Sequence, residues 1–227
     1  MRSRLVQLLS SSLLISLGCA VLALLLFTEL AEEVLEGETQ RFDDWVRLTV
    51  HGFASPTVTA IMRILSFFGS VTVVSAVTVV SALAFLVGGR RRPAALVFVS
   101  LIGAALLMFL MKIFFQRLRP DPFFGEALPS SFSFPSGHAL VSFSVYSTLT
   151  AFAMAHQSSR PVRALMWTLT AILILGIGFS RIYLGVHHAS DVVAGYLAAL
   201  VWTMGVWTAY RRVGRESSVS QAGPDAT

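Results

Sequence analysis

The sequence is poor in charge, lysine and cysteine. Only 13% of its 227 residues are charged, 55% are hydrophobic, and Cys19 is the single cysteine. One cysteine excludes an intrachain disulfide and leaves the redox compartment open. Internal repeats and low-complexity linkers are also missing, which favours one compact helical bundle over two domains. Several apolar runs are about as long as the roughly 20 residues that cross a bilayer, so we expect an integral membrane protein.

Lysine occurs once, at Lys112, and the other basic residues are arginines. The formal net charge of +5 is distributed among the apolar runs and forms no basic face. A nucleic-acid partner is therefore not expected. The partners that this composition predicts are membrane lipids.

The apolar runs predict an all-α, polytopic bundle of six transmembrane helices. The predicted spans are residues 5–27, 71–87, 94–115, 138–155, 164–179 and 188–210. The first run also resembles a cleaved signal peptide, but it is longer than a signal core usually is, which favours a retained helix. Gly69 and Ser70 precede the second span, and residues 57–68 are expected at the membrane surface. We expect residues 1–215 to form the membrane domain and residues 216–227 a disordered tail.

A short amphipathic pattern lies between the first two predicted spans. Its apolar residues Phe42, Trp45, Val46, Thr49 and Phe53 recur at helical spacing, opposite several charged residues. The pattern predicts a helix that either lies in the membrane surface or packs on the bundle.

Six spans place both termini on one side of the membrane, and the arginines indicate which side. The arginines on the side of the termini are Arg2, Arg4, Arg90, Arg91, Arg92, Arg160, Arg163, Arg211, Arg212 and Arg215. Those on the other side are Arg41, Arg47, Arg63, Arg117, Arg119 and Arg181. The first group is larger, so the positive-inside rule places both termini in the cytoplasm of a cell inner (plasma) membrane. Residues 116–137 and 180–187 then face the extracytoplasmic side, where we expect an active site.

The segment GFSRIYLGVHHASD, residues 178–191, places polar side chains between two apolar runs. His187 and Asp191 are four residues apart, so on a helix the carboxylate can hydrogen-bond one imidazole nitrogen and leave the other free to attack. Arg181 would sit at the end of the preceding helix, where its guanidinium suits phosphate oxygens. Taken alone, the segment is equally compatible with a cationic helix end beside a structural histidine.

A second segment, KIFFQRLRP, contains Lys112 and Arg119 at the predicted outer end of the third span. A charge within a span is a functional candidate, although near a helix end Lys112 can also extend to the interface. Pro120 fixes the exit from the helix after Arg119. Arg117 is either a second contact of the same site or a solvated charge.

Pro135, Ser136, Gly137 and His138 stand at the start of the fourth predicted span. A helix N-terminus offers unpaired N–H groups to an anion. Gly137 lets the backbone approach that anion closely, the Ser136 hydroxyl adds a donor, and His138 can deliver a proton. Alone, the tetrapeptide also fits an ordinary helix cap beside a surface histidine.

The three segments occur together and on the same predicted side of the membrane, which removes most of the false-positive risk of a short motif. At these residues the chain resembles the type 2 phosphatidic acid phosphatase family, the membrane lipid phosphatases related to vanadium haloperoxidases and bacterial class A acid phosphatases. The resemblance covers the six-span plan and the motif residues from Lys112 to Asp191.

The resemblance implies a role for each motif residue. His187 would be the nucleophile that forms a phosphohistidine, Asp191 would orient it, and His138 would protonate the leaving oxygen and later activate water. The groups that would hold the phosphoryl oxygens are Lys112, Arg119, Ser136, Gly137 and Arg181. These cations would take the place of a metal ion, so neither a metal nor a cofactor is expected.

The other histidines and the loop phenylalanines give weaker expectations. His188 is expected at the rim of the site, and His51 and His156 outside it. Four phenylalanines either line the mouth where a lipid tail enters or anchor the loop at the interface: Phe123, Phe124, Phe132 and Phe134.

The sequence therefore predicts an enzyme that hydrolyses a lipid phosphate or diphosphate. The resemblance suggests undecaprenyl diphosphate, phosphatidylglycerol phosphate and phosphatidate as substrates, and transfer to another lipid as the alternative reaction. A transporter is less expected, because it would more often show broken spans or internal repeats and the sequence shows neither. A vanadium-dependent oxidase would share the anion site, but such an enzyme is not expected within a membrane. The motifs bind a phosphoryl group that all these lipids share, so they do not distinguish among the lipids. The sequence also defines no oligomeric state.

Overall fold

The computed structural model describes residues 2–127, 129–155 and 157–221, with side chains described from residue 14 to residue 211 of these ranges. Within them the fold is all-α, and no strand is present. The helices are α1 (Arg2–Glu36), α2 (Gln40–His51), α3 (Pro56–Phe68), α4 (Val71–Val87), α5 (Arg91–Phe115), α6 (Gly137–Met154), α7 (Arg160–Tyr183) and α8 (Ala189–Gln221).

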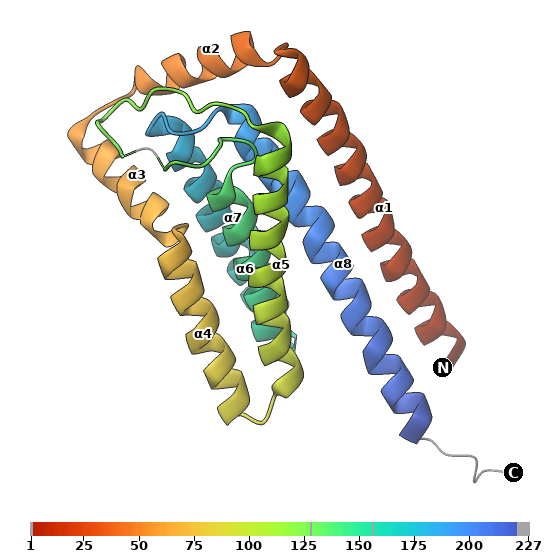
Figure 1. Ribbon diagram of the computed structural model, residues 1–227. Helices are drawn as coiled ribbons and strands as arrows, with labels where there is room; N and C mark the ends of the chain where they lie inside the picture. The colour runs from red at the N-terminus through yellow and green to blue at the C-terminus, as the bar shows by residue number, and fades with distance from the viewer. Residues whose placement is uncertain (1, 128, 156, 222–227) are drawn as a thin grey trace, which may run out of the picture.

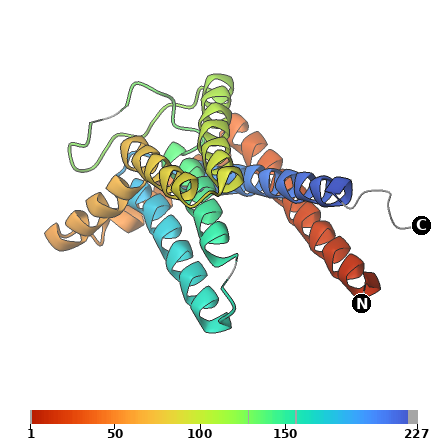
Figure 2. The ribbon, with the colours of Figure 1, turned by 90° about the horizontal axis from the view of Figure 1, so that it is seen from below.

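The long helices run lengthwise through the molecule, and α2 lies across one end (Figure 1). The loop between α5 and α6 lies at that same end, whereas the start of α1 and the end of α8 lie at the opposite end. In the centre of the bundle, α6 packs against α5, α7 and α8. Seen along the bundle, α7 and α8 diverge from each other toward the end that contains the start of α1 (Figure 2).

Four described helices are long and apolar enough to cross a membrane, and the bent pair α3 and α4 makes a fifth if it counts as one span. The bend between α3 and α4 is 49°. The protein is therefore a multi-pass membrane protein, but six spans are not confirmed because α6 does not meet this criterion. More than half of its 18 residues are buried and many are Ser or Thr. Protein surrounds this helix, so its surface need not be as apolar as one that faces lipid.

The break between α3 and α4 lies at Gly69 and Ser70, where the sequence predicts it. Ser70 caps α4 by accepting a hydrogen bond from the N–H of Val73 at 3.3 Å, and α4 has the predicted bounds, Val71–Val87. A Cβ atom on Gly69 would lie 2.3 Å from Ile177 and 3.0 Å from His138. Only glycine lets this break pack so closely against α6 and α7.

Helix α1 extends beyond the predicted end at residue 27 and includes the acidic stretch. Its buried residues Phe27, Ala31 and Val34 recur every three or four positions, and α1 packs along α8. The acidic side chains lie on the opposite, exposed face. Continued packing on α8 thus keeps this polar segment helical.

The face of helix α2 that packs on the bundle contains both a carboxylate and valines. Asp43 is buried, and Val46 and Val50 pack against buried residues of the bundle. Phe42 and Trp45 are exposed, as expected of a helix at a membrane surface. The structure therefore confirms that this helix packs on the bundle, and the face that packs inward contains the charge of Asp43.

Candidate active site

His187 and Asp191 form the centre of the candidate site, where α7 ends and α8 begins. The His187 side chain is only 2% exposed. Its Nδ1 lies 3.1 Å from Oδ2 of Asp191, and the same oxygen accepts the backbone N–H of His188 at 3.0 Å. Because a carboxylate only accepts, Nδ1 carries the proton and Nε2 keeps its lone pair. Nε2 accepts a hydrogen bond from Nη1 of Arg119 at 3.0 Å.

Burial keeps His187 neutral. Its pKa falls from the ordinary 6.5 to about 3 because of burial, although the hydrogen bond and the charge of Asp191 act in the opposite direction. Between pH 6.5 and about 3 the unfolded chain binds a proton that the folded chain does not. The folded state is therefore fully stabilised above this window and loses stability as the pH falls through it.

Arg119 and Lys112 are held by backbone carbonyl groups, most of them in the loop between α5 and α6. Arg119 donates to the carbonyl oxygens of Ser131 at 2.8 Å and Val186 at 2.9 Å. Lys112 donates to the carbonyl oxygens of Phe132 and Ser133. Neither cation is neutralised by a described carboxylate at ion-pair distance, so both retain positive charge for a bound anion.

Arg181 and Ser136 contribute buried polar atoms that have no partner within the described residues. Arg181, in the last turn of α7, donates from Nη1 to the hydroxyl of Ser66, but its Nε is unsatisfied. The hydroxyl of Ser136 is likewise buried and unsatisfied. Buried donors normally have partners, and an oxygen atom of a bound anion would supply one for each of these two atoms.

Gly137 and His138 begin α6 at this cluster. A Cβ atom on Gly137 would lie 2.3 Å from the sulfur of Met108, so glycine allows α5 and α6 to approach. His138 lies within electrostatic reach of Arg181, His187, Arg119 and Lys112. The backbone N–H of Ser136 donates to the carbonyl oxygen of Asp191 at 2.9 Å, which joins the start of α6 to that of α8. The structure thus brings together all the residues that the sequence placed in the site.

Arg117 and Asp43 form a buried ion pair that sequence reasoning missed. Nη2 of Arg117 lies 2.8 Å from Oδ2 of Asp43, and Nη1 lies 2.8 Å from Oδ1 of Asp191. Asp43 also accepts the backbone N–H of Ser190 at 2.9 Å. Of the two sequence interpretations of Arg117, the solvated charge is wrong, because the side chain is only 12% exposed and pairs with two buried carboxylates. It joins α2 to the carboxylate that holds His187.

The structure also places His188 and Phe134. His188 is 5% exposed and lines a polar cavity of about 420 Å³ beside Arg119. The expectation for Phe134 needs correction. Phe134 is a core residue that packs on Phe27 and Phe115, so it does not line a lipid entrance. Apolar loop residues of this kind are buried when the loop folds back onto the bundle.

Three more expectations concern aromatic residues. His51 stacks on Phe123 with ring centroids 4.0 Å apart, away from the catalytic cluster as expected, and Phe124 stacks on Tyr183. Both phenylalanines therefore anchor the loop. His156 lies outside the described residues.

Among the described residues, no group of three or more His, Cys, Asp or Glu side chains is arranged to hold a metal ion.

Comparisons with curated proteins identify relatives with named activities. The chain is 34% identical over 97 residues to phosphatidylglycerophosphatase B of Bacillus subtilis (strain 168), a match that covers 42% of this chain and 47% of that protein. It is 30% identical over 167 residues to undecaprenyl-diphosphatase of Sulfolobus acidocaldarius, covering 71% of this chain and 72% of that protein. The match thus spans about half of the first relative and most of the second.

Two solved structures share the fold. A transmembrane PAP2 type phosphatidylglycerolphosphate phosphatase from Bacillus subtilis superposes with a TM-score of 0.80 at 24% identity, over 86% of this chain and 96% of that one. LpxE of Aquifex aeolicus gives a TM-score of 0.51 at 22% identity, over 72% and 93% of the two chains. The sequence also matches the PAP2 superfamily over residues 93–215. With that match and the site geometry, the chain belongs to the PAP2 superfamily.

Proposed function

We propose that this protein is a membrane phosphatase that hydrolyses a lipid phosphate or diphosphate through a phosphohistidine. The observation that supports the proposal most directly is the His187 imidazole, whose Nδ1 is held by Asp191 while Nε2 faces Arg119. A neutral imidazole with one nitrogen fixed by a carboxylate presents a nucleophile at the other.

The reaction has two displacements at phosphorus. In the first, Nε2 of His187 forms a bond to phosphorus, the bond to the leaving oxygen breaks, and His138 gives that oxygen a proton. In the second, His138 takes a proton from water, whose oxygen attacks phosphorus and releases His187 and inorganic phosphate. Asp191 holds the imidazole throughout and stabilises the positive charge that develops on it.

Charge stabilisation comes from the protein in this proposal. Lys112, Arg119 and Arg181 surround the phosphoryl group, with the Ser136 hydroxyl and the backbone of Gly137 as further donors. The unsatisfied Nε of Arg181 and hydroxyl of Ser136 fit this assignment because a phosphoryl oxygen supplies the missing acceptor. These cations do the work of a metal ion, so the proposed hydrolase is metal-independent.

The proposed substrates share a phosphate group on a membrane lipid. The relatives are named for phosphatidylglycerol phosphate and undecaprenyl diphosphate, and phosphatidate has the same reacting group. Water is proposed as the acceptor. The described segments nearest the site, α2 and the loop after α5, pack onto the bundle and leave no separate module for a bulky acceptor lipid.

The function is tested by measuring inorganic phosphate released from these three lipids by purified protein in detergent. The soluble ester p-nitrophenyl phosphate is the control. We expect at least one lipid to exceed the soluble ester by roughly tenfold or more in kcat/KM, because remote binding energy from the lipid lowers the barrier. A chelator should leave the rate unchanged. Label that moves from a lipid diphosphate to an added acceptor lipid, with little free phosphate, would establish transfer instead.

We also propose six spans, with α3 and α4 as one bent span and α6 as the central one. Both termini are then cytoplasmic, and the site faces the extracytoplasmic side. The support is the larger number of arginines at the end where α1 begins.

Cysteine labelling tests this orientation. In a Cys19→Ala background, a membrane-impermeant maleimide applied to intact cells should label Ser130→Cys and spare Ser158→Cys. Both serines are exposed, and the two changes are chemically identical, so reactivity is matched. Permeabilised cells should label both positions. The reverse pattern in intact cells would place the active site on the cytoplasmic side.

A further inference from the structure

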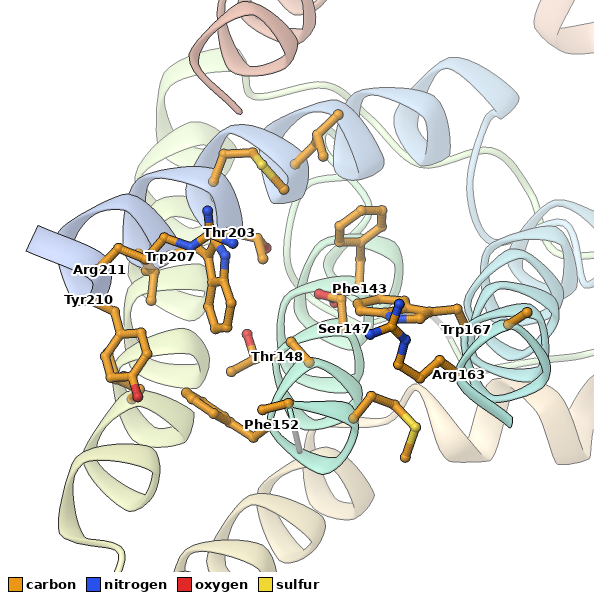
Figure 3. Close-up of a pocket in the computed structure, with 18 of the residues that line it drawn as sticks. Phe143, Ser147, Thr148, Phe152, Arg163, Trp167, Thr203, Trp207, Tyr210 and Arg211 are labelled. Atoms are coloured by element: carbon orange, nitrogen blue, oxygen red, sulfur yellow. The ribbon is translucent and has the colours of Figure 1, made fainter. Parts of the chain in front are cut away.

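A second large cavity lies at the end of the bundle opposite the candidate active site. It has a volume of about 810 Å³ and lies between α6, α7 and α8. Figure 3 shows Trp167 and Arg163 of α7 on one side, Trp207 and Arg211 of α8 on the other, and side chains of α6 between them. We call it the arginine groove, because Arg160 also lines it. A cavity of this size accommodates an organic molecule rather than only water.

The position of the groove separates it from the proposed chemistry. Its lining on α6 runs from Phe143 to Met154, and His138 stands in the first turn of that helix. At 1.5 Å per residue, the arginine end lies roughly 24 Å from His138. A phosphate bound at the arginines is therefore out of reach of His187, so the arginine end of the groove is separate from the candidate active site.

The described charges of the groove are all positive. Arg160, Arg163 and Arg211 line it, and no aspartate or glutamate is among the described residues that do so. Arg160 and Arg163 are exposed in the first turns of α7, where the positive end of the helix dipole adds to their charge. The guanidinium of Arg211 lies 5.2 Å from the ring of Trp207, so a third positive charge stands on the α8 side of the groove.

The rest of the groove is apolar and aromatic. Phe152 is buried at its floor, and its ring is close to those of Trp207 and Tyr210. Tryptophan and tyrosine concentrate where acyl chains meet headgroups. Arginines at the edge and aromatic rings deeper in the bundle match the order of headgroup and chain in a phospholipid.

We propose that the arginine groove binds an anionic phospholipid from the leaflet on the side of the termini. Its headgroup phosphate pairs with Arg160 and Arg163, and one acyl chain lies along α6 between Trp167 and Trp207. Basic pockets between transmembrane helices bind anionic headgroups by this combination of charge and apolar contact. This lipid is a bound ligand, not a substrate, and the inference does not depend on the catalytic roles proposed above.

Fluorescence quenching tests the proposal with the intact protein in nanodiscs of phosphatidylcholine. Phosphatidylglycerol with brominated chains is the probe, because bromine quenches nearby tryptophan and this lipid has no phosphomonoester for the active site to release. We expect it to quench Trp167 and Trp207 at a concentration about tenfold lower than brominated phosphatidylcholine does. The double variant Arg160→Gln and Arg163→Gln should abolish this difference.

Two further variants make the outcome decisive. Arg90→Gln with Arg91→Gln removes the same charge at the same end, outside the groove lining, and should keep the tenfold preference. Thr203→Phe fills the groove without changing charge and should weaken quenching by both lipids.

Equal quenching by the two lipids in the wild type would overturn the proposal, as would an equal loss of preference in the Arg90 and Arg91 control. If Arg160→Gln instead changes only KM for the lipid substrate, the groove holds a substrate chain and the proposal is wrong.

Discussion

His187→Ala is expected to lower phosphate release from a lipid substrate by at least about four orders of magnitude, the size of effect seen when a nucleophile is removed from a catalytic triad. The bond from Nε2 to phosphorus cannot form in this variant. Substrate binding should persist, because Lys112, Arg119 and Arg181 still surround the phosphate. Rapid quenching of the wild-type reaction in alkali should trap an acid-labile phosphohistidine that the variant lacks.

His188→Ala is the matched control for this experiment. His188 is adjacent and similarly buried, but only its backbone N–H contacts Asp191. Its loss should change turnover by less than about tenfold and leave the phosphohistidine detectable. Turnover in His187→Ala within tenfold of the wild type, or trapped phosphate on another residue, would disprove the assignment of the nucleophile.

The gathering of the site residues was predictable from the sequence because local rules fix most of the geometry. His187 lies just before α8 and Asp191 lies in the first turn of that helix, so their short separation along the chain keeps the two side chains within 3.1 Å. Helix direction then brings the ends of α5 and α7 and the start of α6 to one end of the bundle. Apolar run length and charge sufficed to predict that arrangement.

Features that depend on tertiary packing were not predictable in this way. A charge such as Asp43, opposite the apolar face of an amphipathic helix, indicates a solvated side, yet its burial is set by Arg117 and Ser190 from distant segments. The polar surface of α6 is tolerated only because other helices cover it. Phe134 and Phe123 are phenylalanines of the same loop, and the sequence gives no sign that only Phe134 is a core residue. Phe134 is buried because the loop folds back onto Phe27 of α1 and Phe115 of α5.

The buried pair leads to the second large expected effect. Arg117→Gln is expected to reduce the stability of the folded protein by about 3–5 kcal/mol, because Asp43 is left without its ion-pair partner in a buried position. Asp43 is fully buried and the side chain of Arg117 is 12% exposed. The matched control is Arg63→Gln, since Arg63 pairs with Glu126 at the same distance of 2.8 Å but is 54% exposed. That change should cost only about 0–1 kcal/mol.

Activity measurements on the folded fraction separate positioning of His187 from structural support alone. Arg117 contacts Asp191 but not the expected phosphate site, so Arg117→Gln should lower kcat by roughly a hundredfold, the effect of a small misplacement of a catalytic group, with KM nearly unchanged. Arg117→Lys keeps one charge but cannot bridge two carboxylates as a guanidinium does, so it should restore stability more than kcat. Thermal unfolding in detergent and single-turnover phosphohistidine formation measure the two effects.

If Arg117→Gln unfolds no more readily than Arg63→Gln, the buried pair does not stabilise the fold. If it destabilises the protein while the surviving fraction forms phosphohistidine at the wild-type rate, Arg117 supports the fold without positioning His187.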